Sequence, residues 1–133
     1  MAKPLLDPWN DAAQIAAHLN DNTVQLVVGL GAEWCSLCVS VRPGFAVLAA
    51  AAPPAEHWLW LNLEEHSELL GDFMPQTLPL LWVYQGSKLL AHGQIDAASG
   101  LPSKAALLET LTPLSDLPES SIRTRLIQPD WAV

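Results

Sequence analysis

A Cys-x-x-Cys pair constrains this chain more than any other feature, because it stands between a predicted buried strand and a predicted long helix. The pair is Cys35 and Cys38, the only two cysteines among 133 residues, and the apolar run 26–30 precedes it. Residues three apart in the first turn of a helix lie on one face. Two sulfurs placed in this way can close a short disulfide and open it again.

The start of a helix also favours the reactive form of a thiol. Unpaired backbone N–H groups and the positive end of the helix dipole stabilise a thiolate, which is the form that attacks a disulfide. Redox chemistry is therefore the favoured interpretation of Cys35 and Cys38.

Two other interpretations of the pair stay open from the residues alone. A structural zinc site normally needs four N or S ligands. The missing ligands would have to come from scattered histidines, no two of which have the spacing of a zinc finger; these are His18, His57, His66 and His92. The cysteines could also be buried and inert, as unpaired cysteines often are. We expect neither a metal ion nor another cofactor.

Composition points to one folded, acidic domain. Half of the residues are apolar and 15% are charged, which argues against disorder, and the length suits a single hydrophobic core. The formal net charge of −8 disfavours nucleic acid and anionic membranes as partners.

Residues 1–8 lack the apolar stretch of a secretory signal, and no segment approaches the ~20 apolar residues that span a bilayer. We therefore expect a cytoplasmic protein, in which a lone cysteine pair rests reduced and forms only a transient disulfide.

Hydrophobic patterns predict helices and strands in alternation. Helices are expected over 8–20, 35–52, a short stretch of 64–73, and 103–111; strands are expected over 24–30, 58–63, 80–84 and 89–92. Pro43 falls inside the long helix and should kink it. The segment 24–30 is expected to be a buried strand, and the strand 58–63, apolar on both faces, suits a parallel strand covered on both sides. A turn over 85–88 makes the last two strands an antiparallel hairpin.

The alternating part of this order predicts an α/β fold with a parallel sheet and crossover helices, to which the hairpin adds an antiparallel edge. We divide the chain into a domain over residues 1–112 and a C-terminal extension over 113–133. The extension carries three prolines and several apolar residues. It either packs on the domain as a strap, which we favour, or docks a partner.

The landmarks around the cysteines resemble those of the thioredoxin family. Ala32-Glu33-Trp34-Cys35-x-x-Cys38 matches the active-site signature of that family, Pro43 matches its helix-kinking proline, and Leu78-Pro79 matches its cis-proline segment. The separation of Cys35 from Pro79 also fits without a gap.

The resemblance extends over roughly residues 5–112 in element order, and its specific motifs lie within 32–43 and 77–84. It implies a thioredoxin-like three-layer α/β/α sandwich with a central mixed sheet of four to five strands.

The resemblance also implies a reaction. Cys35 would attack a protein disulfide and form a mixed disulfide, and Cys38 would resolve it by closing the Cys35–Cys38 disulfide. Pro79, with a cis bond from Leu78, would lie against the Cys35 sulfur and present backbone to an extended peptide. The expected substrate-binding residues are Trp34, Leu37, Leu78 and Pro79, whereas Trp58, Trp60 and Trp82 are assigned to the core.

The chain departs from the family pattern around the pair. Gly29 stands at the position of a buried aspartate that the family uses as a proton relay, Gly31 replaces a tryptophan, and Val39 replaces a lysine. The loss of the aspartate puts general acid–base assistance in doubt, and such assistance typically contributes ~10²–10⁴ in rate. Glu33 and Arg42 are candidates to replace it, although either could be a plain surface charge.

Ser36-Leu37 also replaces the usual Gly-Pro between the cysteines. These changes make the surface around the pair more apolar, through Trp34, Leu37, Val39, Met74, Pro75 and Leu78. An exposed cluster of this kind usually marks a protein partner.

Two classes of function follow. We favour a thiol–disulfide oxidoreductase that acts on a protein disulfide and is then reduced again by an unidentified reductant. The alternative is a non-catalytic binding module or assembly chaperone that uses the apolar surface and the 113–133 extension. A third option, metal or redox sensing through the cysteine pair, is separated by elemental analysis. The sequence is silent on the oligomeric state.

Overall fold

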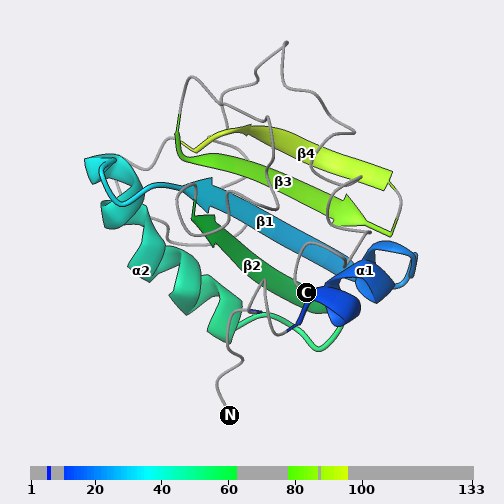
Figure 1. Ribbon diagram of the computed structural model, residues 1–133. Helices are drawn as coiled ribbons and strands as arrows, with labels where there is room; N and C mark the ends of the chain where they lie inside the picture. The colour runs from blue at the N-terminus through cyan, green and yellow to red at the C-terminus, as the bar shows by residue number, and fades with distance from the viewer. Residues whose placement is uncertain (1–5, 7–10, 63–77, 87, 96–133) are drawn as a thin grey trace.

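The computed structural model describes residue 6 and residues 11–62, 78–86 and 88–95. Within these ranges it has two helices and four strands (Figure 1): α1 (Ala12–Leu19), β1 (Gln25–Gly31), α2 (Ser36–Ala50), β2 (Glu56–Asn62), β3 (Leu80–Gln85) and β4 (Lys88–Gln94). All four predicted strands and the long helix are present, with ends that shift by one or two residues. The helices expected within 64–73 and over 103–111, and the extension over 113–133, lie outside the described residues.

The strands form a mixed sheet, as expected, but β3 runs antiparallel to β1 and not parallel to it as the alternation of strands and helices predicts. The order of the strands is β2-β1-β3-β4; β1 pairs parallel with β2 and antiparallel with β3, and β3 pairs antiparallel with β4. The β3–β4 hairpin turns at Gly86, whose φ of +56° is a backbone conformation that favours glycine. Because β1 lies between β2 and β3, the carboxyl end of β1 lies away from the two outer strand edges of the sheet.

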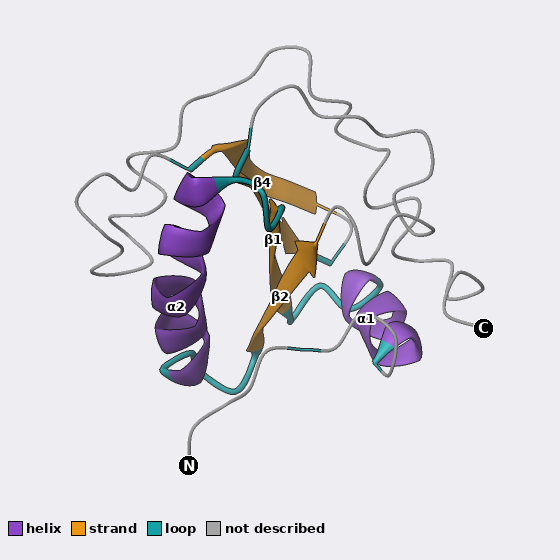
Figure 2. Cartoon of the chain, turned by 60° about the vertical axis from the view of Figure 1, so that its left-hand side comes forward, coloured by secondary structure: helices purple, strands orange, loops and turns teal. Residues whose placement is uncertain are grey.

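The two helices cover opposite faces of the sheet (Figure 2). Successive side chains of a strand point to opposite faces, so β1 contributes to two separate cores. The core on the α1 side is made by Ala12, Ile15, Leu19, Leu26, Val28, Leu30, Leu59, Leu61, Leu80, Trp82 and Tyr84. The core on the α2 side is made by Val27, Cys38, Val41, Phe45, Ala49, Trp58, Trp60, Leu81, Val83 and Ile95. The fold is the expected three-layer α/β/α sandwich.

An aromatic cluster holds α2 on the sheet. The ring of Phe45 meets Trp58 and Trp60 edge to face, with centroids 4.9 and 5.1 Å apart, and such pairs contribute about 0.5–1.5 kcal/mol each beyond their buried area. The Trp58 indole N–H donates to the buried Glu56 carboxylate at 2.7 Å. Trp58, Trp60 and Trp82 are all buried, which confirms their assignment to the core.

Neither of the two described helices is long and apolar enough to cross a membrane.

Candidate active site

A tight turn connects the end of β1 to the start of α2 and carries the first cysteine. Cys35 is the N-cap of α2, with extended backbone at φ −94° and ψ 109°. Its N–H donates to the carbonyl of Ala32 at 3.2 Å, and its carbonyl accepts the N–H of Val39 at 3.1 Å. This turn directs the Cys35 sulfur over the first turn of the helix.

The two cysteines meet as the three-residue spacing predicts. The Cys35 sulfur accepts the backbone N–H of Cys38 at 3.2 Å, and both cysteines are reduced thiols. An N–H donor aimed at a sulfur is an arrangement that stabilises thiolate charge.

Access to the two sulfurs is unequal. Cys35 is half-buried, whereas only 1% of Cys38 is exposed. Burial raises the pKa of the Cys38 thiol to about 12, and a hydrogen bond with the Cys35 side chain adds to the rise. At neutral pH Cys38 is therefore a protonated, covered thiol, and Cys35 is the sulfur that a bulky disulfide can approach.

The segment ahead of β3 is fixed by β4 and the residue that follows it. The Leu78–Pro79 peptide bond is cis, as the resemblance implies. The Pro79 carbonyl accepts the N–H of Ile95 at 2.9 Å, and the Gln94 side-chain amide donates to the Leu78 carbonyl at 3.4 Å. Both carbonyls of this segment thus have partners inside the fold.

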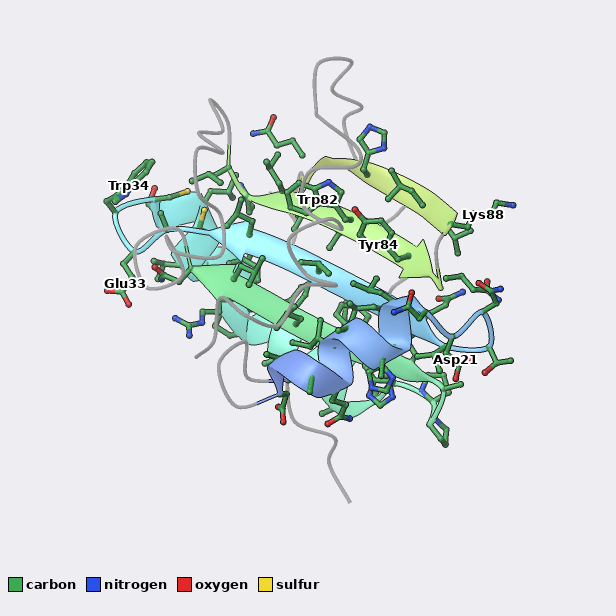
Figure 3. All side chains as sticks on the ribbon, turned by 45° about the vertical axis from the view of Figure 1, so that its right-hand side comes forward. Asp21, Glu33, Trp34, Trp82, Tyr84 and Lys88 are labelled. Atoms are coloured by element: carbon green, nitrogen blue, oxygen red, sulfur yellow. The ribbon has the colours of Figure 1, made fainter. Side chains whose placement is uncertain are left out.

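The expected substrate-binding residues differ in exposure. Trp34 is 70% exposed and extends from one end of the sheet, the end that also carries Glu33 (Figure 3). Leu37 and Leu78 are half-buried against the α2-side core, which Cys35 also contacts, and Pro79 is buried. Val39 adds a second apolar side chain, at 55% exposure. Met74 and Pro75 lie outside the described residues.

Trp60 explains the two glycines that depart from the family pattern. A Cβ added to Gly29 would lie 2.7 Å from Trp60 Cε3 and 3.1 Å from Phe45 Cε2. A Cβ added to Gly31 would collide with the same indole and lie 3.0 Å from the Cβ of Cys38. The indole of Trp60 therefore occupies the space beside Cys38 that side chains at these two positions would need.

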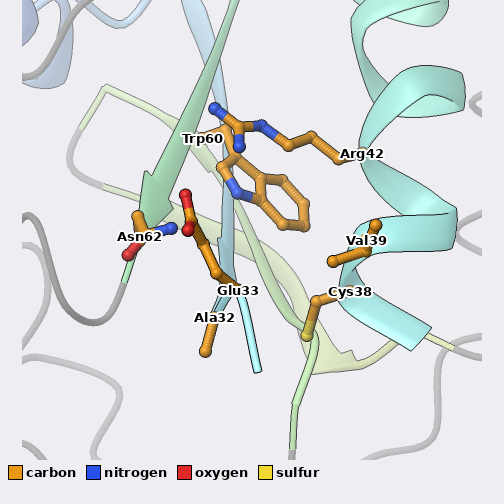
Figure 4. Close-up of a pocket in the computed structure, with 7 residues that line it drawn as sticks. All are labelled: Ala32, Glu33, Cys38, Val39, Arg42, Trp60 and Asn62. Carbon is orange, nitrogen blue, oxygen red and sulfur yellow. The ribbon is translucent and has the colours of Figure 1, made fainter. Parts of the chain in front are cut away.

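A small cavity lies beside Cys38, near the carboxyl end of β1 (Figure 4). Its volume is about 20 Å³, and it is lined by Ala32, Glu33, Cys38, Val39, Arg42, Trp60 and Asn62. Glu33 and Arg42, the two candidates to replace the missing aspartate, thus line the same cavity as the buried Cys38. Asn62, which the sequence did not single out, is 3% exposed and pairs with Gly31 in the sheet register.

The histidines considered as zinc ligands lie elsewhere or outside the described residues. His18 and His57 stack on each other with centroids 4.0 Å apart, and His57 pairs with Leu26 near the start of β1, whereas the cysteines follow its end. In the part of the chain that the structure describes, no three His, Cys, Asp or Glu side chains form a metal-binding group.

Solved structures provide the comparison that decides the fold. Thioredoxin from Trypanosoma brucei brucei superposes with a TM-score of 0.54 and 17% identity, over 69% of this chain and 79% of that one. Thioredoxin from Malassezia sympodialis gives 0.54 and 13%, over 71% and 80%. Trxlp from Edwardsiella tarda EIB202 gives 0.54 and 21%, over 80% and 97%. The chain has a thioredoxin fold.

No protein-family model and no curated protein matches the sequence. At 13–21% identity, the similarity to thioredoxins establishes the thioredoxin fold, and the chemistry has to be argued from the site itself.

Proposed function

We propose that this chain is a thiol–disulfide oxidoreductase that exchanges the Cys35–Cys38 pair with a disulfide in another protein. The observation that carries the proposal is the unequal pair: the approachable Cys35 sulfur lies 3.2 Å from the backbone nitrogen of the buried Cys38. A half-buried attacking sulfur beside a covered resolving sulfur suits two-step exchange, because only the first of them can meet a foreign disulfide.

The reaction would proceed in two displacements. The Cys35 thiolate attacks one sulfur of the substrate disulfide, which breaks and releases a first substrate thiolate that takes up a proton. The Cys38 sulfur then attacks the Cys35 sulfur, loses its own proton, and releases the second substrate thiolate. The substrate gains two electrons, the pair becomes a disulfide, and an external dithiol reductant restores it.

The surface around Cys35 supports a protein substrate with an apolar segment beside its disulfide. Trp34 and Val39 are exposed apolar side chains next to the pair, and exposed apolar clusters mark protein contacts. In this proposal Trp34 and Leu37 contact the substrate, and the Leu78–Pro79 segment limits the direction from which it approaches. Nucleic acid and membranes are not partners in the proposal.

The proposal places the protein in the cytoplasm. A reducing compartment would keep the pair as thiols at rest and make the disulfide a transient product of turnover.

A binding module on the same fold is the second candidate, and the 70% exposure of Trp34 is the observation that favours it. Such a protein would present the same apolar surface and leave the cysteines without a catalytic role.

Reduction of insulin by dithiothreitol, followed as precipitation of the freed B chain, separates the two candidates. The oxidoreductase accelerates the reaction, and Cys35→Ser abolishes the acceleration. When Cys38→Ser is reduced, freed of dithiothreitol and mixed with insulin, it accumulates a mixed disulfide. No acceleration by the wild type, or equal acceleration by Cys35→Ser, overturns catalysis. Partner binding that survives replacement of both cysteines by serine then favours the binding module.

A further inference from the structure

The Leu78–Pro79 segment lies near the turn that carries Cys35. In the antiparallel β1–β3 register the first residue of β3, Leu80, pairs with Leu30 near the end of β1. The two residues that precede Leu80 therefore extend past the end of β1, toward the turn. Cys35 and Leu78 also pack against the same core. A peptide whose disulfide reaches Cys35 is therefore close to this segment.

The segment offers an extended peptide little backbone to pair with. Pro79 has no N–H, and its carbonyl accepts the N–H of Ile95 at 2.9 Å. The carbonyl of Leu78 is the remaining acceptor, and it accepts the side-chain amide of Gln94, with the nitrogen 3.4 Å from the oxygen. Peptides that bind by adding a strand gain their affinity from such main-chain hydrogen bonds, so an occupied carbonyl weakens this mode of binding.

The sheet register places Gln94 within reach of Leu78. Gln94 is the last residue of β4, which lies beside β3 (Figure 1), and it pairs with Leu80. In an antiparallel pair the residue two positions from the direct partner is a diagonal neighbour, within reach of a long side chain. Leu78 is that neighbour. The Gln94 side chain is half-buried, so it is held against the segment and still borders solvent.

We propose that Gln94 determines substrate specificity by withholding the Leu78 carbonyl from extended peptides. The proposal rests on the thiol–disulfide exchange proposed above. With this acceptor occupied, a substrate is held mainly by side-chain contacts, for which the exposed indole of Trp34 is available. The favoured substrate is then a folded protein with apolar side chains beside its disulfide. A linear peptide that binds by adding a strand is disfavoured.

The hydrogen bond from Gln94 to Leu78 weakens strand pairing without forbidding it. Its length of 3.4 Å exceeds the ~3.0 Å that is typical of N–H···O bonds, and a carbonyl oxygen has two lone pairs. A peptide N–H can therefore displace the Gln94 amide or share the oxygen with it. The expected effect on peptide binding is severalfold, because one hydrogen bond contributes only modestly to net affinity.

A peptide disulfide tests the role of Gln94. The probe is a short linear peptide whose single cysteine forms a mixed disulfide with 5-thio-2-nitrobenzoate. Attack of the Cys35 thiolate on the peptide sulfur releases the nitrobenzoate as a coloured thiolate, so single-turnover rates measure the half-saturating peptide concentration. We expect Gln94→Ala to lower this concentration about threefold. The rate with 5,5′-dithiobis(2-nitrobenzoate), which has no peptide backbone, should not change.

An N-methylated form of the same peptide separates hydrogen bonding from a merely structural effect of the substitution. The methyl groups are placed on the backbone nitrogens of its cysteine and of the two flanking residues. An N-methyl amide cannot donate a hydrogen bond, so the gain from Gln94→Ala should disappear with this peptide.

The matched control is Gln85→Ala. Gln85 also donates its side-chain amide to a backbone carbonyl, that of Asn22 at 3.0 Å, but it pairs with Gln25 at the start of β1, whereas the cysteines follow the end of that strand. This variant should bind both peptides as the wild type does.

Three results overturn the role of Gln94: unchanged or weaker binding of the unmethylated peptide by Gln94→Ala, an equal gain in Gln85→Ala, or a gain that persists with the methylated peptide. A wild type that reacts with the peptide but never closes the Cys35–Cys38 disulfide contradicts the exchange reaction instead, so the two failures are distinguishable.

Discussion

Trp60 stands over Gly29 on the neighbouring strand, so closely that a Cβ on the glycine would lie 2.7 Å from the indole Cε3. The two residues are paired in the β1–β2 register. The indole of Trp60, which carries no charge, fills from β2 the space that side chains at Gly29 and Gly31 on β1 would need. Gly29 therefore has to lack a side chain, because Trp60 fills the space that the side chain would occupy.

Gly29→Ala tests this packing directly. The added methyl group has no space, so we expect the free energy of unfolding to fall by about 1–3 kcal/mol, although alanine normally favours folding over glycine by reducing the entropy of the unfolded chain. Urea unfolding followed by fluorescence measures the change. In a Trp60→Leu background the same substitution should cost little or be stabilising, because the clash is gone. An equal cost in both backgrounds would contradict the packing.

The unequal pair predicts which thiol is alkylated first. In the reduced protein at neutral pH, iodoacetamide should modify Cys35 at least about a hundredfold faster than Cys38, because Cys38 is 1% exposed and its pKa is near 12. Peptide mass spectrometry after timed quenching measures both rates. In urea the two rates should become similar, and similar rates in the folded protein would be inconsistent with a covered Cys38.

The raised pKa of Cys38 also predicts a loss of stability in alkali. Its pKa rises from an ordinary value of 9.0 to about 12 in the folded protein, so between these values the unfolded chain gives up a proton that the folded chain keeps. Stability then falls as pH rises, and below pH 9.0 Cys38 makes no pH-dependent contribution. Urea midpoints under reducing conditions, from about pH 8 to about pH 11, measure the slope.

Other groups also titrate in this alkaline range, so the comparison is with Cys38→Ala. That variant should have a shallower decline than the wild type, whatever its stability at neutral pH. Parallel declines in the two proteins would show that Cys38 keeps an ordinary pKa.

The exposed indole of Trp34 should matter for protein substrates alone. We expect Trp34→Ala to raise the KM for insulin about tenfold, equivalent to roughly 1.4 kcal/mol of lost contact. The rate at which Cys35 attacks a small disulfide, 5,5′-dithiobis(2-nitrobenzoate), should not change. Val47→Ala is the matched control, because Val47 is 67% exposed on α2 but lies about three helical turns beyond Cys38 and Cys35 along the helix. Equal effects of the two substitutions, or an equal loss with both substrates, would argue against a docking role for Trp34.

Much of the described fold could be predicted from local apolar patterns. The segments that become β1, β2 and β3 are apolar on both faces, because both faces are covered, and this pattern marks a strand whatever its partners are. The cysteine pair could likewise be placed, since a spacing of three residues at a helix start brings Cys35 and Cys38 together. The cis bond ahead of Pro79 followed from the family resemblance and not from the residues themselves.

The surroundings of Cys38 could not be predicted in the same way. Trp60 was correctly assigned to the core, but its position over Gly29 and Gly31 depends on the register between β1 and β2, which is set by contacts distant in sequence. The same register brings Asn62 to the cavity. Glu33 and Arg42 were candidates because of their distance from the cysteines along the chain, and only the fold shows that they share a cavity with Cys38.

The proposed exchange requires Cys35 and Cys38 to cycle between two thiols and one disulfide. Equilibration of the protein in glutathione buffers of graded potential, followed by acid quenching, alkylation and mass spectrometry, measures this directly. We expect a single two-electron transition from a doubly alkylated protein to one with an intramolecular Cys35–Cys38 disulfide. A pair that stays reduced across the whole series, or that yields only mixed disulfides with glutathione, would contradict it.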